Sequence, residues 1–376
     1  MPERKSAPAR KGLSMLDAEK SRKIYAQMKE DQMQYLIVSD ISSINYLIGK
    51  RIHPGERMMV LLFDSVKEKA VFVLSKLFPQ EEDLGCPILY FDDVDDYVGM
   101  LAAQMPECGT VGIDKEWPAR FLLRLMELQP QNRFINGSYV VDHIRQIKSA
   151  EEQELMIASS RMNDEAMRRL IPLTGKGYSE VELAKELGKI YTELGADANS
   201  FEPICCYGAN AADPHHSING TRGKKGDSVI FDIGCKLKGY CSDMTRTVFL
   251  GSVSEEQKKV YEIVKEANLR AIAAVKPGVR FCDVDAAARD YITEQGYGPQ
   301  FIHRTGHNIG QDTHEYGDVS SANTNVLKPG MTFSIEPGIY LSGDFGVRIE
   351  DLVLVTEDGC RVLNEVSKEL TVVEME

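Results

Sequence analysis

The sequence has 376 residues, and nowhere does it contain an uninterrupted apolar run of about 18 residues, the length that a membrane-spanning helix requires. Its first segment, MPERKSAPARKGLSML, is polar and basic and lacks the apolar stretch of a secretory signal. Membrane and secreted proteins are therefore disfavoured. We expect a soluble, cytoplasmic protein in which residues 1–14 form a flexible tail.

An excess of basic residues is also lacking. The 44 Lys and Arg stand against 57 Asp and Glu, which gives a formal net charge of −13. Because such a chain repels phosphate backbones, nucleic acid is not an expected partner. The eight cysteines form no CxxC pair, so reduced thiols are expected. Thiolate ligation of a metal is a minor alternative for Cys235 and Cys241, which lie close in sequence to Asp232 and Asp243.

Two domains are expected from the pattern of apolar residues. In the first part, strands are predicted at 35–40, 58–63, 69–75 and 111–114, with an amphipathic helix at 116–129. This alternation predicts an α/β domain over residues 15–145. Ser149 followed by Glu152 predicts a capping box at the start of a long helix, so a second domain is expected at 149–376.

The order of elements repeats within the second domain, although the sequence does not. Helices predicted at 149–170 and 179–194 precede one strand pair, and helices at 254–275 and 282–295 precede another. Each strand pair carries two carboxylates. We therefore expect an α+β domain with pseudo-two-fold symmetry that brings two acidic hairpins together.

Those four carboxylates are candidate metal ligands. Asp232 ends an apolar strand, and Asp243 lies in the next strand, where the period of two can place both side chains on one face. Glu336 and Glu350 repeat this arrangement in the second strand pair. Buried carboxylates that lie close together repel one another unless a divalent cation lies between them. The alternative is a set of solvated strand-end acids, with Arg348 and Glu350 forming a surface ion pair.

Histidines are concentrated in two segments, PHH (214–216) and HRTGHNIGQDTHE (303–315). His303 and His307 have the i, i+4 spacing of helical zinc ligands, but the glycines nearby favour an irregular strand. His307 is then the expected nitrogen ligand, while His303 and His314 remain available for proton transfer or oxyanion stabilisation. Four carboxylates and one imidazole suit two divalent ions, with manganese expected first and cobalt, zinc or iron as alternatives.

Four segments in this order resemble the pita-bread metallopeptidases, the family of methionine aminopeptidase, prolidase and aminopeptidase P: FDIGCKLKGYCSDMTRT, HRTGHNIGQDTHE, FSIEPGIY and GVRIEDLVLVTEDG. The resemblance implies a two-metal site whose ligands are Asp232, Asp243, His307, Glu336 and Glu350. The stretch INYLIGKRIHPGER (44–57) resembles the creatinase-type N-terminal domain of the prolidase and aminopeptidase P branch. Methionine aminopeptidases normally lack that domain.

In that branch, the resemblance implies hydrolysis of Xaa–Pro bonds in short proline-containing peptides by a metal-bridging hydroxide, in a homodimer. Glu336 is the expected general base and then acid. The remaining residues that match catalytic or substrate-contacting positions are His215, His303, His314, Tyr340 and Arg348. Four positions beside the site depart from the family pattern and leave substrate preference less defined: Asp213, Asn308, Gln311 and Thr313.

Several alternatives remain open at this point. The sequence does not separate a dipeptidase from an aminopeptidase that accepts longer peptides. A relative of creatinase would act on another small amide without metal, but all five expected ligands are present. A catalytically altered relative could also serve as a binding module.

Overall fold

The computed structural model describes residues 16–376, so the tail expected at residues 1–14 lies outside the described residues. The chain divides into two compact units, of which the first ends at Arg145 and the second comprises Gln146–Glu376. Within the described residues, no helix combines the length and the apolar character needed to cross a membrane.

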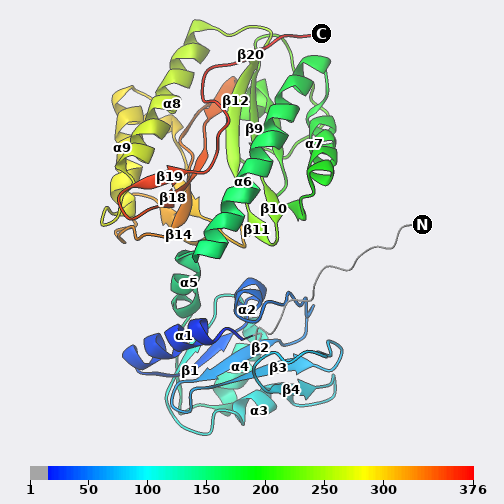
Figure 1. Ribbon diagram of the computed structural model, residues 1–376, viewed down its shortest axis with the longest axis vertical. Helices are drawn as coiled ribbons and strands as arrows, with labels where there is room; N and C mark the ends of the chain where they lie inside the picture. Colours follow the sequence, from blue (N-terminus) through cyan, green and yellow to red (C-terminus); the bar gives the residue numbers. More distant parts are fainter. Residues whose placement is uncertain (1–15) are drawn as a thin grey trace, which may run out of the picture. The chain divides into compact units, whose positions relative to one another are not determined.

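The first unit is built on a six-stranded sheet with the order β4-β3-β2-β1-β5-β6 and a hydrophobic core on each face (Figure 1). Pairs β1–β2 and β2–β3 are antiparallel, and the other pairs are parallel. The strands are Met33–Val38 (β1), Val60–Asp64 (β2), Lys69–Ser75 (β3), Ile88–Phe91 (β4), Thr110–Ile113 (β5) and Arg133–Asn136 (β6). The helices are Ala18–Glu30 (α1), Ile41–Ile48 (α2), Tyr97–Ala102 (α3), Ala119–Leu128 (α4) and Tyr139–Gln146 (α5).

The second unit contains the four long helices that the sequence predicts. They are Ala150–Leu170 (α6), Glu180–Leu194 (α7), Glu255–Ala274 (α8) and Phe281–Glu294 (α9), with short 3₁₀ turns at Ile171–Lys176 (η1), Gly208–Ala212 (η2) and Gly298–Gln300 (η3). The capping box of Ser149 and Glu152 is present at α6, and Ser179 and Glu182 form the same motif at α7. Local sequence therefore determines where both helices begin.

Two main sheets accompany these helices, with the orders β20-β12-β9-β8 and β14-β13-β15-β18-β19, and two small sheets have the orders β11-β10-β7 and β16-β17. The first main sheet packs against α6 and α7, and the second against α8 and α9. The repeated order confirms the expected fold class. The strands are Ala198–Asn199 (β7), Ile204–Tyr207 (β8), Ser228–Ile233 (β9), Cys235–Leu237 (β10), Tyr240–Cys241 (β11), Met244–Leu250 (β12), Gly306–Asn308 (β13), Glu315–Val319 (β14), Thr332–Ile335 (β15), Gly338–Leu341 (β16), Phe345–Arg348 (β17), Asp351–Val355 (β18), Cys360–Val362 (β19) and Val372–Val373 (β20).

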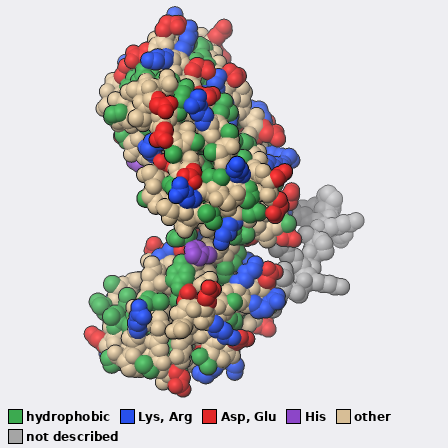
Figure 2. Space-filling view, turned by 90° about the vertical axis from the view of Figure 1, so that its left-hand side faces the viewer, with side chains coloured by type: hydrophobic (Ala, Val, Ile, Leu, Met, Phe, Trp, Pro, Cys, Tyr) green, Lys and Arg blue, Asp and Glu red, His purple; other side chains and the backbone are tan. Residues whose placement is uncertain are grey.

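Charged side chains are mixed on the surface. On the face that Figure 2 shows, basic and acidic side chains are interspersed over each unit. Pairs such as Arg57–Asp93 and Arg270–Glu266 have N–O distances of 2.8 and 2.7 Å. Because exposed pairs of this kind contribute only about 0–1 kcal/mol each, the cores dominate stability. Buried acids are therefore the ones that need a physical explanation.

Asp164 is one such buried acid, and it allows a stability prediction. Its Oδ2 accepts the Glu365 backbone N–H at 2.8 Å, whereas its buried Oδ1 has no hydrogen-bond partner among the described residues. Burial raises the pKa of Asp164 to about 6. Since the folded pKa exceeds the unfolded one, the protonated form favours folding, and this contribution is lost as the pH rises through about 6.

Asp164→Asn keeps an acceptor for Glu365 without carrying a charge. We expect it to raise the free energy of unfolding at pH 8 by on the order of 3 kcal/mol, and by about half as much at pH 5. Urea unfolding at the two pH values measures this difference. Asp290→Asn, at an exposed position on α9, is the control that should change neither value. A destabilised Asp164→Asn protein at pH 8 would contradict the explanation.

Candidate metal centre and its pocket

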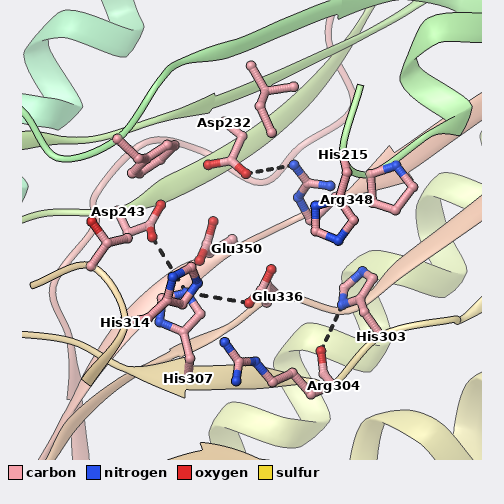
Figure 3. Close-up of a pocket in the computed structure, with 14 residues that line it drawn as sticks. His215, Asp232, Asp243, His303, Arg304, His307, His314, Glu336, Arg348 and Glu350 are labelled. Carbon is pink, nitrogen blue, oxygen red and sulfur yellow. Dashed lines mark hydrogen bonds and ion pairs between the residues drawn. The ribbon is translucent and has the colours of Figure 1, made fainter. Parts of the chain in front are cut away.

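All five predicted metal ligands line one cavity of about 490 Å³ in the second unit (Figure 3). That volume falls within the roughly 300–1,000 Å³ of typical small-molecule sites. The lining residues are Phe201, Ile204, Pro214, His215, Asp232, Asp243, His303, Arg304, His307, Thr313, His314, Glu336, Arg348 and Glu350. The acidic hairpins that are separate in the sequence therefore meet at one place.

The carboxylates stand at or beside the ends of two antiparallel strand pairs. Asp232 lies on β9 and pairs with Thr245 of β12, and Asp243 directly precedes β12. Glu336 directly follows β15, and Glu350 directly precedes β18, the partner of β15. The two strand pairs thus supply two carboxylates each, as the repeated element order predicts.

His307 lies on β13 and faces these carboxylates. A register shift between His307 and Asn308 makes β13 irregular, as expected, and rules out the helical zinc-ligand spacing. The Nδ1 of His307 is 3.2 Å from the Asn308 carbonyl oxygen, to which it donates, so Nε2 carries the lone pair. Nε2 is 3.7 Å from Asp243 Oδ2 and 3.6 Å from Glu336 Oε1. The imidazole is therefore in the tautomer that can ligate a metal.

Negative charge is crowded in this cavity. Burial, reinforced by neighbouring carboxylates, raises the pKa of Asp243 and of Glu350 well above the ordinary range. Burial also raises the pKa of Glu336 to about 7 and lowers that of His307 to about 3. Buried Oδ1 atoms of Asp232 and Asp243 have no hydrogen-bond partner among the residues from 16 onward.

These features fit a divalent cation. One ligand atom each from Asp243, His307 and Glu350 lies within 4.8 Å of the others. Divalent ions bound among the carboxylates would offset their repulsion and occupy the unpaired oxygens. The donor set of oxygens and one nitrogen suits such ions.

Two asparagines hold the carboxylate-bearing strands in corresponding ways in the two halves. Asn163 on α6 donates to the carbonyl of Ile233, next to Asp232, at 2.7 Å. Asn268 on α8 donates to the carbonyls of Ile335 and Ile349, each next to one of the glutamates, at 2.9 and 3.3 Å. Both asparagines are fully buried. Each long helix therefore fixes the backbone that positions its hairpin.

Arg348, Tyr340 and His303 form a hydrogen-bonded chain beside the cluster. Arg348 donates from Nη2 to Asp232 at 2.6 Å and from Nη1 to the Tyr340 hydroxyl at 2.8 Å. Arg348 Nε also donates to Thr245, so three of its N–H groups are used within the protein. The Tyr340 hydroxyl is 2.8 Å from His303 Nε2, and His303 Nδ1 is 2.7 Å from the Arg304 carbonyl oxygen. His303, assigned from these partners, donates to that carbonyl and accepts from Tyr340.

The remaining cavity residues differ in how exposed they are. His215 and His314 are exposed, and the His314 ring lies 4.2 Å from that of His307, centroid to centroid. Four lining residues are not among those predicted from the sequence: Pro214 and Arg304, which lie within the two histidine-rich segments, and Phe201 and Ile204. Arg304 lies between His303 and His307 in a segment already singled out, so its position was a usable signal. Phe201 and Ile204 precede the recognised segments, and no sequence signal marked them as site residues.

The four departures from the family pattern do not all reach the cavity. Thr313 lines it, whereas Asp213 lines a neighbouring pocket with Tyr340. Asn308 is buried and donates to the Tyr316 carbonyl, and Gln311 donates its backbone N–H to Glu315. Of these four positions, Thr313 is therefore the one placed to affect substrate directly.

Cys235 and Cys241 do not belong to the cavity lining. The Cys235 thiol contacts Ser159 and Ser242, and the Cys241 thiol donates to the Gln311 carbonyl oxygen at 3.4 Å. Both side chains are buried. The geometry therefore does not support the alternative in which these thiolates bind the metal.

Comparison with known proteins agrees with this architecture. Residues 154–357 match the model of metallopeptidase family M24, and residues 20–147 match the creatinase/prolidase N-terminal domain. An uncharacterized peptidase of Staphylococcus aureus is 32% identical over 362 residues, which cover 93% of this chain and 99% of the relative.

Solved structures are similar over nearly the whole chain. The prolidase of Thermococcus sibiricus has a TM-score of 0.89 and 36% identity, covering 95% of this chain and 98% of that one. The Xaa-Pro dipeptidase of Bacillus anthracis has a TM-score of 0.85 and 30% identity, covering 94% and 99%.

The chain belongs to metallopeptidase family M24 and carries a creatinase/prolidase N-terminal domain. It is a peptidase, and the family implies that divalent metal ions take part. The predicted family and the predicted enzyme class are both confirmed.

Proposed function

We propose that this protein is a two-metal exopeptidase that hydrolyses Xaa–Pro bonds in short peptides, with dipeptides as the preferred substrates. The observation that carries the proposal is the meeting of four carboxylates and one ligand-competent imidazole in a single cavity. Similarity to a prolidase and to an Xaa-Pro dipeptidase supports the choice of bond.

The metal ligands in this proposal are Asp232, Asp243, His307, Glu336 and Glu350. Two divalent ions held there would supply a nucleophilic water at neutral pH and polarise the scissile carbonyl. Manganese is our first expectation, with cobalt, zinc and iron as alternatives, because oxygen-rich sites accept all of them.

Glu336 is the proposed general base. It lines the cavity, and its Oε1 is held 3.3 Å from the Ser334 hydroxyl and 3.6 Å from His307 Nε2. From there it takes a proton from the attacking water and returns it to the leaving proline nitrogen. A group that does both must remain close to the reacting bond, which the buried strand end ensures.

His314 is the better placed of the two histidines proposed to stabilise the oxyanion. The donor of His303 is used by the Arg304 carbonyl, and its Nε2 accepts from Tyr340. His314 lines the cavity, and no side-chain hydrogen bond of its own is recorded among the described residues. We therefore assign the oxyanion contact to His314 and a positioning role to His303. His215, which also lines the cavity, stays a proposed substrate contact.

Arg304 is the proposed anchor for the carboxylate of a dipeptide. Its side chain lines the cavity, and no ion pair is recorded for it in the part of the chain that the structure describes (Figure 3). Two N–H groups of Arg348 have no partner among the described residues, so it stays a proposed secondary contact, while Tyr340 orients it. A free guanidinium binds a carboxylate by paired, charge-assisted hydrogen bonds.

Arg304→Ala should raise KM for Ala-Pro by roughly 10–100-fold with a smaller change in kcat, because a hydrogen bond to a charged group contributes about 1.5–3 kcal/mol. Steady-state kinetics with Ala-Pro and with Ala-Pro amide separate the contact of Arg304 with the substrate carboxylate from any other effect of the substitution. The amide lacks the carboxylate, so the substitution should affect it little. Equal losses on both substrates would argue against the anchor.

Hydrolysis of Ala-Pro, Ala-Pro-Ala and Ala-Ala by metal-loaded enzyme tests the proposed function. We expect metal-dependent cleavage of Ala-Pro, slower cleavage of Ala-Pro-Ala, and no cleavage of Ala-Ala. Faster cleavage of the tripeptide would indicate an aminopeptidase, and no cleavage by metal-loaded protein would favour a binding module. The homodimer and the cytoplasmic location stay predictions, and sedimentation measures the first.

A further inference from the structure

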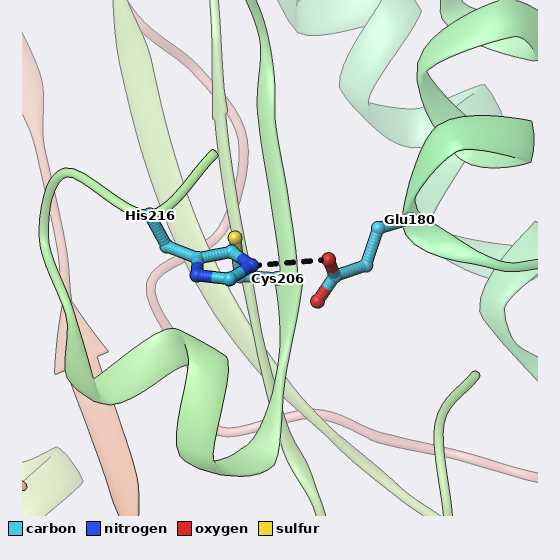
Figure 4. Close-up of side chains that lie close together, drawn as sticks. All are labelled: Glu180, Cys206 and His216. Atoms are coloured by element: carbon cyan, nitrogen blue, oxygen red, sulfur yellow. Dashed lines mark ion pairs between the residues drawn. The ribbon is translucent and has the colours of Figure 1, made fainter. Parts of the chain in front are cut away.

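A second cluster of side chains that could bind a metal lies in the same unit (Figure 4). Its members are not among the residues that line the cavity described above. Glu180 is the first residue of α7, Cys206 lies on β8, and His216 lies in the segment between η2 and β9. One ligand atom from each lies within 4.8 Å of the other two. Three separate segments therefore bring a carboxylate, a thiol and an imidazole together.

Glu180 is a buried acid whose basic neighbour, among the described residues, is His216. Its carboxylate accepts the backbone N–H of Tyr207 at 3.1 Å, the backbone N–H of Asn219 at 3.0 Å and the side-chain amide of Asn210 at 2.9 Å. The side chain is 0% exposed, and no Lys or Arg ion pair is recorded for it within residues 16–376. These hydrogen bonds fix the carboxylate in place, but a buried charge also needs a compensating one.

His216 faces this carboxylate with its Nε2 atom. Its Nε2 is 3.4 Å from Glu180 Oε2 and 3.1 Å from Asn219 Nδ2. The orientation of the Asn219 amide is fixed, because its Oδ1 accepts the Thr221 backbone N–H at 2.8 Å. Nε2 has a single lone pair, so it accepts from Asn219 Nδ2 only while it carries neither a proton nor a metal ion. In that state Nε2 and Glu180 Oε2 are two acceptors facing each other, and a proton on Nε2, or a metal ion bound there in place of the Asn219 contact, removes this conflict.

Cys206 supplies a third ligand without a competing role. Its side chain is fully buried, and no hydrogen bond is recorded for its thiol among the described residues. Cys206 packs with Ala211, Ile230 and Tyr340, whereas the adjacent Cys205 packs in a different cluster beneath α6 and α7. The two neighbouring cysteines therefore lie in different surroundings, as the alternation along a strand requires.

We propose that Glu180, Cys206 and His216 form a separate, thiolate-containing site for a zinc-type divalent ion. Ligands about 2.0–2.1 Å from a tetrahedral zinc lie roughly 3.3 Å apart, close to the 3.4 Å between Glu180 and His216. One sulfur, one nitrogen and one oxygen suit zinc, with solvent in the fourth position. The S–metal bond replaces the S–H bond, and the proton leaves to solvent.

The ion would hold the segment that carries a cavity residue. His216 directly follows Pro214 and His215, which line the proposed active-site cavity. Coordination would tie His216 to α7 and β8 and so restrain His215. This consequence for catalysis rests on the proposed function, whereas the metal site itself does not.

Cobalt(II) titration of the metal-free, full-length protein tests the site through thiolate-to-cobalt charge-transfer absorption in the near ultraviolet. The five ligands proposed for the peptidase centre contain no sulfur, so this band reports on the second cluster. We expect the band to saturate at one equivalent for the thiolate site and to disappear when zinc is added. A His216⁺–Glu180 ion pair, the proton alternative, predicts no band.

Matched variants locate the ligand. Cys206→Ser should abolish the band, and Cys205→Ser, one residue away in the other core cluster, should keep it. His216→Asn should weaken cobalt affinity at least tenfold, and His53→Gln, at an exposed position of the first unit, should not. If Cys206→Ser does not fold, the comparison of the two histidine variants decides.

Two results would overturn the proposal: no band in folded wild-type protein, or a band that survives Cys206→Ser and His216→Asn. Either would leave Xaa–Pro hydrolysis unaffected. Conversely, a protein that shows the band but cleaves no peptide would contradict the proposed function and leave this site standing.

Discussion

Glu336→Gln should lower kcat for Ala-Pro by at least about 10³-fold, because general acid–base catalysis contributes roughly 10²–10⁴-fold and this residue is also a proposed metal ligand. The amide is nearly the size of the carboxylate but can neither accept a proton from water nor return it. Steady-state assays with excess manganese measure kcat, and metal analysis of the same sample measures how much metal is bound.

Glu357→Gln is the control for this substitution, since Glu357 is exposed in the turn between β18 and β19. It should leave kcat within a factor of two. If Glu336→Gln retains metal and also retains near-normal turnover, the general base is another group. If it loses all metal, the lower rate reflects the loss of a metal ligand. Restoration of activity at higher metal concentration would then show that the general base is another group.

Asp243→Asn should weaken metal binding without destabilising the metal-free fold. Asp243 is 3% exposed, and its burial, reinforced by neighbouring carboxylates, raises its pKa, so its charge destabilises the metal-free fold. Removing its charge should leave the thermal midpoint of the metal-free protein unchanged or higher. It should also remove most of the increase that metal gives the wild type.

The expected size follows from mass action. Metal at 100 times its dissociation constant stabilises by about 2.7 kcal/mol, which corresponds to roughly 5–10 °C for a domain of this size. Differential scanning fluorimetry with and without manganese measures both midpoints. Asp358→Asn, at an exposed position, should behave like the wild type. An Asp243→Asn protein with the full metal-dependent increase would show that Asp243 is not a ligand.

The sequence predicts most of what depends on short-range patterns. Ser149 and Ser179 mark their helix starts because each side chain bonds an N–H three residues away. The candidate ligands could be found because a carboxylate after an apolar strand is costly to bury without a partner. The repeated element order then predicts that Asp232 and Glu336 come from corresponding strand pairs.

Interactions between distant segments could not be predicted in the same way. Arg348 donates to Asp232 because β17 packs beside β9, a contact that no local pattern encodes. The same limit applies to His303, whose spacing from His307 shows nothing of its bond to Tyr340. Side-chain spacing identifies which residues carry chemistry, whereas tertiary packing decides which of their hydrogen-bonding groups remain free.

The cluster of Glu180, Cys206 and His216 shows this limit most clearly. From the sequence, Glu180 is expected to be an ordinary acidic residue in the first turn of α7. Cys206 is expected to be a small core residue of β8. In the segment PHH, the family resemblance pointed to His215 and not to the adjacent His216. Only the fold brings the three together within 4.8 Å.

Anomalous X-ray diffraction from crystals grown with manganese tests the central claim most directly. The account predicts two adjacent anomalous peaks in the cavity, both within bonding distance of the five proposed ligands: Asp232, Asp243, His307, Glu336 and Glu350. A single peak, or manganese bound elsewhere with these five side chains unligated, would contradict a two-metal centre built from the paired hairpins.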